Sequence, residues 1–472
     1  MPAPLSGSPA PWAPPGPAHD EPRAERPNLA PPQAAVEAAR CLSCTDAPCT
    51  AACPTHIDVP RFIRRILDGN VAGAAHTILD ANIFGAGCAR ACPVEVLCEG
   101  ACVYHALEAP PVAIGALQRY AVEHGGAPGG RGMYRAPSPA PGAPSVGVVG
   151  GGPAGLAAAH ALRLRGWGVT IYEAREELGG LHLRGVAPYK VGVDLARDEV
   201  EGVLSVGGVD VRTGVALGHD VTLEELTGRH AAVFLACGLG GDRRAGVPGE
   251  DLPGVVGAVE LLEGLKLAGA ETAAGAAGEP AVSGARVALV VGGGNTAMDA
   301  ARALVAAGVP RVELVYRGDE EQMTGYAHEW DEARREGVVG RFRTVPVAYE
   351  GGPEGLERVL LAPTDAGKRP LEGRAYPLAA QLVVLALGQT PRDVRGLLGA
   401  AGEGLQVERG RLVVDADGFT GRPGLYAGGD CVNGGREVVD AVAAGRRAAA
   451  AIDAWLARGV RAGGAEAEEG AG

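Results

Sequence analysis

Two patterns of apolar residues divide the chain. Between residues 34 and 125, apolar positions recur at helical spacing, as in IDVPRFIRRILDGNVAGAAHTIL and IGALQRYAVEHG, and this spacing predicts α-helices. Between 145 and 458, short β-branched runs alternate with helical segments, which is the pattern of an α/β fold. The sequence therefore predicts a helical N-terminal domain followed by an α/β core.

The remaining segments lack a periodic pattern. Residues 1–33 are proline-rich and are expected to be a disordered, extended tail. Residues 126–144 are rich in proline and glycine and are expected to be a linker, and 459–472 to be a disordered, solvated tail. The N-terminus has no apolar segment typical of a secretory signal, and no run of about 18 apolar residues exists. We therefore expect a cytoplasmic protein without a membrane partner.

Charge and cysteine content narrow the function. The net charge is −13 and no basic run is present, so nucleic acid is not an expected partner. Eight of the ten cysteines lie between Cys41 and Cys102. Because structural disulfides are rare in a reducing compartment, this crowding favours metal or cluster ligation.

A first nucleotide-binding motif opens the α/β core. In SVGVVGGGPAGLAAAHALRLRGWGVTIYEA, a strand ends at Gly150-x-Gly152-x-x-Gly155, a helix follows, and the second strand ends at Glu173. The glycines allow a pyrophosphate to approach the backbone, and the carboxylate can accept hydrogen bonds from ribose hydroxyls. The alternative is a tight turn in an unrelated α/β domain.

A second motif lies in ARVALVVGGGNTAMDAARALVAAGVPRVELVYRG. Gly292-x-Gly294-x-x-Ala297 follows a strand and opens a helix, but the next strand ends at Arg317 instead of an acid. A cation there can accept the 2′-phosphate of NADP. The first site therefore suits FAD and the second a nicotinamide nucleotide; the alternative for Arg317 is an exposed residue at a strand end.

A third motif, Gly428-Gly429-Asp430, follows a short strand near the C-terminus. Asp430 is expected to bind the flavin's ribityl or pyrophosphate region, with helix capping as the alternative. The predicted order is FAD-binding domain (145–241 and 391–458) interrupted by an NAD(P)H-binding domain (242–390). This order resembles the flavoprotein reductases with two dinucleotide-binding domains and a glutathione-reductase-like core.

The exit for electrons is expected at the N-terminus. Cys237 and Cys431 are isolated in the sequence and are expected to be small buried residues, so no CxxC redox pair lies near the flavin. The N-terminal spacing is C-x2-C-x4-C-x3-C-P, followed by Cys88-x3-Cys92-Pro and then Cys98-x3-Cys102. This spacing is typical of iron–sulfur ligation; zinc and disulfides are the alternatives.

These cysteines and the segments around them, RCLSCTDAPCTAACPTHIDVPRFI, CARACPVEVLCEGACV and IGALQRYA, resemble the electron-input half of dihydropyrimidine dehydrogenase and the small subunit of NADPH-dependent glutamate synthase. The resemblance runs from about residue 36 to 458. It implies two 4Fe–4S clusters, with two ligand sets. These sets are Cys41, Cys44, Cys49 and Cys102 for cluster one, and Cys53, Cys92, Cys98 and Gln118 for cluster two. Spacing alone would make Cys88 the eighth ligand, whereas the resemblance favours Gln118.

The resemblance also implies cofactor contacts in the α/β core. Leu181 and Lys190, in GGLHLRGVAPYK, are expected beside the flavin; the alternative for Lys190 is a surface lysine. The expected FAD-binding residues are Gly150, Gly152, Pro153, Ala154, Gly155, Glu173, Gly180, Leu181, Lys190, Leu217, Gly429, Asp430 and Val438, and the expected NAD(P)H-binding residues are Gly292, Gly294, Asn295, Thr296, Ala297, Arg317 and Gly388. Gly318 stands where NADPH-using members often carry a second basic residue, which leaves NADH as an alternative.

The expected function is an electron-input subunit with FAD, two 4Fe–4S clusters and NADPH. NAD(P)H would reduce FAD, and the clusters would pass electrons to a separate catalytic subunit, expected because the sequence after the flavin domain has no room for a substrate-reducing barrel. Pyrimidine reduction is the first expectation, supported by Gln118. Glutamate synthase is the alternative, supported by YRGDEEQMTGYAHEW, together with related ferredoxin:NADP oxidoreductases. A non-catalytic FAD-binding scaffold is a third, remote alternative.

Overall fold

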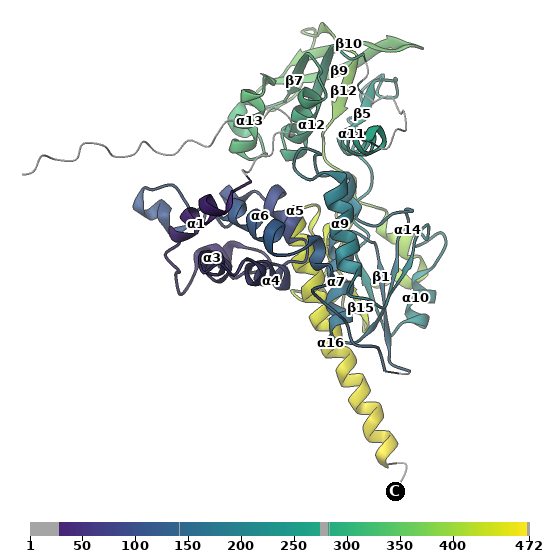
Figure 1. Ribbon diagram of the computed structural model, residues 1–472. Coiled ribbons are helices and arrows are strands. Elements are labelled where there is room, and N and C mark those ends of the chain that lie inside the picture. Colours follow the sequence, from purple (N-terminus) through teal and green to yellow (C-terminus); the bar gives the residue numbers. More distant parts are fainter. Residues whose placement is uncertain (1–27, 141, 274–281, 283, 470–472) are drawn as a thin grey trace, which may run out of the picture.

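The computed structural model describes residues 28–469 except 141, 274–281 and 283. Figure 1 shows it as three lobes, with a long C-terminal helix that runs between the two lower lobes and projects beyond them. Most of the predicted N-terminal tail, 1–27, lies outside the described residues. Its predicted end at 33 is too late, because Leu29 is buried and the first helix, α1, begins at Pro31. A proline near the first position of a helix costs no hydrogen bond, so the proline-rich sequence does not prevent this start.

The N-terminal lobe is helical, as the apolar spacing predicts. Its helices surround a core that includes Phe62, Ile78, Phe84 and Leu117, each at most 1% exposed. The elements are α1 (Pro31–Ala39), α2 (Pro48–Ala52), α3 (Val59–Leu67), α4 (Val71–Ala81), α5 (Gly85–Ala91), α6 (Ile114–Gly125) and the 3-10 turns η1 (Val94–Val96) and η2 (Val103–Leu107).

The second lobe contains a five-stranded parallel sheet in the order β15-β4-β1-β2-β3. The last strand of the chain completes this sheet, so the lobe is built from both sides of an insertion. Its strands are β1 (Ser145–Val149), β2 (Gly168–Tyr172), β3 (Val209–Arg212), β4 (Ala232–Leu235) and β15 (Leu425–Ala427). Its helices are α7 (Pro153–Leu164), α8 (Gly180–Arg184), α9 (Val193–Leu204), α10 (Leu223–Arg229), α14 (Val394–Leu398), α15 (Asp430–Asn433) and α16 (Val438–Glu469).

The inserted lobe repeats this architecture with the parallel order β5-β12-β6-β7-β8 and adds an antiparallel sheet, β11-β10-β9. Its strands are β5 (Val255–Gly257), β6 (Val287–Val291), β7 (Arg311–Val315), β8 (Val339–Arg341), β9 (Thr344–Gly352), β10 (Gly355–Pro363), β11 (Tyr376–Ala379) and β12 (Leu382–Leu385). Its main helices are α11 (Ala258–Ala273), α12 (Asn295–Ala306) and α13 (Ala327–Arg335). Both parallel sheets place their nucleotide turns at the carboxyl ends of strands, where such folds bind ligands.

Two segments differ from the sequence prediction. The predicted linker contains a 3-10 turn, η3 (Pro128–Gly130), that packs on α9 so closely that a Cβ atom at Gly129 would overlap the Glu199 carbonyl oxygen. The predicted tail from 459 is helical through Glu469, because α16 continues into an alanine- and glutamate-rich stretch that favours helix. Among the described residues, no helix is long and apolar enough to span a membrane.

Candidate cluster and nucleotide sites

Cys41, Cys44, Cys49 and Cys102 line one pocket, which we call pocket one. The short helix α2, opened by Pro48, places Cys49 on its first turn. Burial raises the pKa of the Cys41 thiol and raises that of Cys49 to about 11. These thiols therefore keep their protons at neutral pH unless a metal replaces them.

A second pocket, pocket two, is lined by Cys53, Cys92 and Cys98. Both candidates for its fourth ligand, Cys88 and Gln118, line it as well. Gln118 is 8% exposed, and its amide nitrogen donates to the Gly85 carbonyl oxygen at 2.8 Å. Because the Gln118 amide nitrogen is occupied by this hydrogen bond, the side-chain carbonyl oxygen of Gln118 is the atom that can bind a metal.

The two pockets fit iron–sulfur clusters by the chemistry of their donors. Within the part of the chain that the structure describes, no three His, Cys, Asp or Glu side chains gather as ligands of a single metal ion. The predicted cysteine sets line the walls of two separate pockets instead. This arrangement suits a group that fills space and takes one thiolate at each of several iron atoms.

The first nucleotide turn has the backbone that a pyrophosphate needs. Gly150 has φ +105°, and a Cβ atom at Gly155 would overlap the Gly150 carbonyl oxygen. Gly152 precedes α7, so free N–H groups at that helix end face the turn. Glu173 follows β2, and its Oε2 accepts a hydrogen bond of 2.7 Å from the Gly151 nitrogen. The predicted carboxylate therefore lies at the turn.

Two other predicted FAD segments meet this turn. Gly180, at the start of α8, would place a Cβ atom 2.9 Å from the Gly152 Cα. Gly429 would place one 3.0 Å from the Cβ of Ala154, the second residue of α7. The structure therefore brings segments near residues 150, 180 and 429 together, as the sequence predicts for a flavin site.

The remaining predicted FAD residues occupy varied positions. Asp430 is partly buried, and the resulting desolvation raises the pKa of its carboxyl group, whose Oδ1 accepts a hydrogen bond of 3.3 Å from the Arg436 nitrogen. Leu181 is half-buried in α8, and Leu217 is buried beside a bridge to Val221. The contacts of Asp430, Leu181 and Leu217 with FAD stay predictions.

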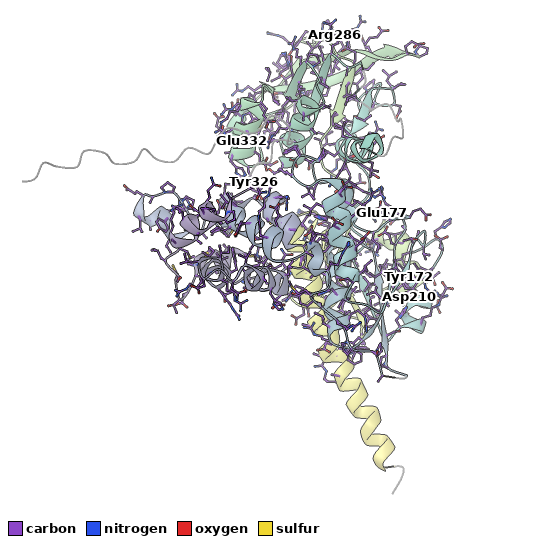
Figure 2. The ribbon with its side chains drawn as sticks, in the orientation of Figure 1. Tyr172, Glu177, Asp210, Arg286, Tyr326 and Glu332 are labelled. Atoms are coloured by element: carbon purple, nitrogen blue, oxygen red, sulfur yellow. The ribbon has the colours of Figure 1, made fainter. Side chains whose placement is uncertain are left out.

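Lys190 is buried between two lobes. Its Nζ lies 2.5 Å from Glu329 Oε1 and 2.9 Å from Asp299 Oδ1, which belong to α13 and α12 of the inserted lobe. The alternative of a surface lysine is wrong, and its contact with flavin stays a prediction. Nearby, Tyr326 donates to Glu437 Oε1 at 3.3 Å. Figure 2 shows Tyr326 where the inserted lobe faces the helical lobe.

The second nucleotide turn repeats the geometry of the first. Gly292 has φ +154°, and a Cβ atom there would overlap the Ala386 carbonyl oxygen. Gly294 precedes α12, and Asn295 Oδ1 accepts a hydrogen bond of 2.8 Å from the Tyr326 nitrogen. Around this turn, Thr296 is exposed and Ala297 buried, and Arg317 and Gly388 are exposed just beyond β7 and β12. The predicted nicotinamide residues therefore line one edge of the sheet.

Comparisons with known proteins agree with this geometry. Residues 22–128 match the family described as dihydropyrimidine dehydrogenase domain II, 4Fe-4S cluster, and residues 144–445 match pyridine nucleotide-disulphide oxidoreductase. The chain is 32% identical to the glutamate synthase [NADPH] small chain of Escherichia coli K12, over 90% of this chain and 92% of the relative. The chain belongs to the pyridine nucleotide-disulphide oxidoreductase family. Within this family it resembles the members with an N-terminal 4Fe–4S domain.

Other relatives are named as subunits of different enzymes. The chain is 33% identical to the NAD-dependent dihydropyrimidine dehydrogenase subunit PreT of E. coli K12, over 89% of this chain and 93% of that one. It is 35% identical to the NADP(+)-dependent formate dehydrogenase subunit beta of Moorella thermoacetica, over 88% of this chain but 60% of that one. Mycobacterium tuberculosis FprA in complex with NADPH matches with TM-score 0.52 and 22% identity, over 68% of this chain and 86% of that one, which shows the shared fold. The two matched domains account for the cofactors: the N-terminal domain is a 4Fe–4S cluster domain, and the oxidoreductase domain binds FAD and a nicotinamide nucleotide.

One feature of this oxidoreductase escapes sequence reasoning. Cys237 and Cys431 are far apart in the chain, but β4 and β15 are adjacent strands, and the residues just after them meet. Both are free thiols, and a hydrogen bond between them lowers the pKa of Cys237 and raises that of Cys431. Cys431 is buried as predicted, whereas Cys237 is only half-buried.

A buried junction joins the three lobes of the oxidoreductase. His182 Nε2 on α8 lies 2.8 Å from Glu199 Oε2 on α9, and both side chains are fully buried. Glu199 Oε1 accepts hydrogen bonds of 2.9 Å from the backbone nitrogens of Ala86 and Gly87 in α5. Lys266 of α11 donates to the His182 carbonyl oxygen at 3.0 Å. No local motif marks these residues, because their partners come from three separate segments.

Proposed function

We propose that the chain is the electron-input component of a larger enzyme, which oxidises NAD(P)H and passes electrons to a separate catalytic subunit. One observation carries this proposal: the first turn of α16 borders two sites. Val439 lines pocket two, and Val438, the preceding residue, is a predicted flavin contact. This shared turn supports pocket two as the cluster pocket beside the flavin site and supports a direct exchange of electrons between the two.

The chain's own residues position the reacting groups. Lys190 and its two carboxylate partners hold the nicotinamide lobe against the flavin lobe, so the two nucleotide turns keep a fixed relation. When bound, FAD supplies a hydride acceptor and the clusters supply single-electron carriers. Because hydride transfer needs no side chain as acid or base, we assign no catalytic His or Cys.

Pocket one supports an exit toward a partner. Three apolar side chains near it are exposed: Leu42 (56%), Val36 (69%) and Leu107 (62%). Leu42 lines pocket one itself, and the others lie in α1 and η2, the elements on either side of its cysteines. Exposed apolar side chains beside a redox site are typical of a docking surface.

We propose a pyrimidine-reducing catalytic subunit as the first candidate acceptor. Gln118 at pocket two and the similarity to PreT support it. The large chain of glutamate synthase is the second candidate, supported by the YRGDEEQMTGYAHEW segment and the match over 92% of the small chain. The similar identities of 33% and 32% do not separate the two.

Anaerobic purification followed by nucleotide titration tests the proposal. About eight irons and one FAD per chain are expected, for two four-iron clusters, with bleaching of the flavin and then of the clusters by NADPH or NADH. Bound zinc instead of iron, or a flavin that neither nucleotide reduces, would refute it. Reconstitution with each candidate partner, assayed with uracil or with glutamine plus 2-oxoglutarate, then identifies the acceptor.

A further inference from the structure

The end of β7 carries one cation where the recognition of a 2′-phosphate favours two. Arg317 is followed by Gly318, and three acids follow at 319–321. By sequence alone, this segment argues against NADPH. In the structure, however, the turn between β10 and β11 brings a second cation, Lys368, next to the end of β7.

Lys368 reaches the nucleotide turn through the ring of Tyr316. Its Nζ lies 5.6 Å from the centroid of that ring. The same Tyr316 ring also packs against the glycine-rich turn, since a Cβ atom at Gly293 would lie 2.6 Å from Tyr316 Cδ2. The ammonium group therefore lies one aromatic ring away from the turn that is expected to hold the pyrophosphate.

Gly318 makes room for this lysine. A Cβ atom at Gly318 would lie 3.0 Å from Lys368 Cε, which is tighter than ordinary contact. Gly318 therefore has no basic side chain of its own, but the basic side chain of Lys368, from the turn between β10 and β11, passes over it. The missing charge in the local sequence is supplied from 50 residues further along the chain.

Hydrogen bonds fix the turn that carries Lys368. Thr364 Oγ1 donates to the Arg317 carbonyl oxygen at 2.9 Å, and the Arg343 nitrogen donates to the Gly318 carbonyl oxygen at 2.9 Å. The Lys368 nitrogen donates to the Asp365 carbonyl oxygen at 2.9 Å. The end of β7 and the turn at 364–370 therefore form one unit, which reduces the entropy lost when a ligand is held.

Two of the three neighbouring acids, Asp319 and Glu320, are already engaged by other partners. Asp319 Oδ2 accepts from Arg343 Nη2 at 3.0 Å, and the pKa of Asp319 is lowered chiefly by its hydrogen bonding to Arg343. Glu320 Oε1 accepts from the Trp330 indole at 2.8 Å. These contacts offset part of the negative charge that would otherwise repel a phosphate.

We propose that Lys368, in the space left by Gly318, is the second cation that binds the 2′-phosphate of NADPH together with Arg317. The inference rests on the proposed function only in that a nicotinamide nucleotide binds at the second turn. A 2′-phosphate is a compact dianion near neutral pH, and two cations from different elements match it better than one.

Lys368→Gln in the full holoenzyme tests the inference. Loss of one charge-assisted contact should lower kcat/KM for NADPH about 10-fold and weaken binding of 2′,5′-ADP, a probe with the 2′-phosphate but no nicotinamide, by a similar factor. Binding of 5′-AMP and the rate with NADH should change less than about twofold, because neither carries the phosphate. Lys368→Arg, which keeps the charge, should recover most of the preference.

Arg369→Gln is the matched control. It removes one positive charge from the adjacent, exposed position of the same turn, and it should leave the NADPH-to-NADH ratio within about twofold. An equal loss in both variants would show a general effect of surface charge and overturn the inference. So would an unchanged ratio in Lys368→Gln. If neither nucleotide reduces the flavin of the unaltered protein, the proposed function fails instead, and binding of 2′,5′-ADP still tests Lys368.

Discussion

Replacing Glu199 by alanine should separate the helical lobe from the flavin lobe. The carboxylate is fully buried, accepts from two backbone nitrogens of α5 at 2.9 Å each, and lies 2.8 Å from His182 Nε2. Alanine favours helix, so α9 itself should persist. The cost comes instead from two buried N–H groups that lose their acceptor, and from a buried imidazole that loses the carboxylate beside it.

The magnitude follows from these contacts. Removing one partner of a buried, hydrogen-bonded charge typically costs about 3–5 kcal/mol, and we expect about 4 kcal/mol for Glu199→Ala. Glu199→Gln keeps one oxygen for the α5 nitrogens and should cost about 1–2 kcal/mol. Glu201, two residues further along α9, is exposed and pairs with exposed Arg131. Glu201→Ala is the matched control and should change stability by less than about 1 kcal/mol.

Urea unfolding followed separately by cluster absorbance and flavin fluorescence measures the effect. In Glu199→Ala, the cluster signal should be lost at lower urea than the flavin signal, and cluster reduction by NADPH should slow relative to flavin reduction. Gly87→Ala should have the same signature through steric overlap, because a Cβ atom at Gly87 would overlap His182. A loss in Glu199→Ala no larger than in Glu201→Ala would refute the reasoning.

Three further predictions concern buried groups. Gln118→Ala should reduce the iron content to about four per chain, while Cys88→Ala should retain about eight, as counted by iron analysis; the reverse result would make Cys88 the ligand. Burial lowers the pKa of Lys266 to about 7, so the free energy of unfolding should rise as pH increases from 7 to 10. Lys266→Met should therefore be more stable than the unaltered protein by about 2–4 kcal/mol at pH 7 but not at pH 10. Burial raises the pKa of Glu437 to about 7, so the free energy of unfolding should fall as pH rises from 4.5 through 7. Glu437→Gln should therefore be more stable than the unaltered protein by about 2 kcal/mol at pH 8 but not at pH 4.5. Urea midpoints across pH check both, and curves parallel to those of the unaltered protein would contradict them.

The sequence predicts best where the chemistry is local. The turns at Gly150 and Gly292 are specified by glycine spacing within one strand–turn–helix unit, so both could be recognised without a structure. The order of the three nucleotide motifs along the chain likewise predicted the interrupted flavin lobe. The end of α16 was mispredicted, because the last residues were expected to form a solvated tail, whereas the helix continues through Glu469.

Features that depend on distant segments could not be predicted in the same way. The contact between Cys237 and Cys431 follows from the order of strands in a sheet, and the position of Lys368 follows from a turn that folds back over Gly318. Each involves residues at least 50 positions apart. Periodicity carries no information over such separations, because it reports which face of one element is buried and not what covers it.

The sharing of α16 between two sites limits the path of electrons. Consecutive residues of a helix point about 100° apart, so Val438 and Val439 face different directions from the same turn. If Val438 contacts the flavin as predicted, the flavin site and pocket two both border the first turn of α16, which limits their separation to roughly one helix diameter, 10–12 Å. Small tilts of the helical lobe would open this gap, and the buried Glu199 junction opposes such tilts from the neighbouring α5. Under the proposed function, we therefore expect this junction to support electron transfer by holding the two sites in position, without touching either cofactor.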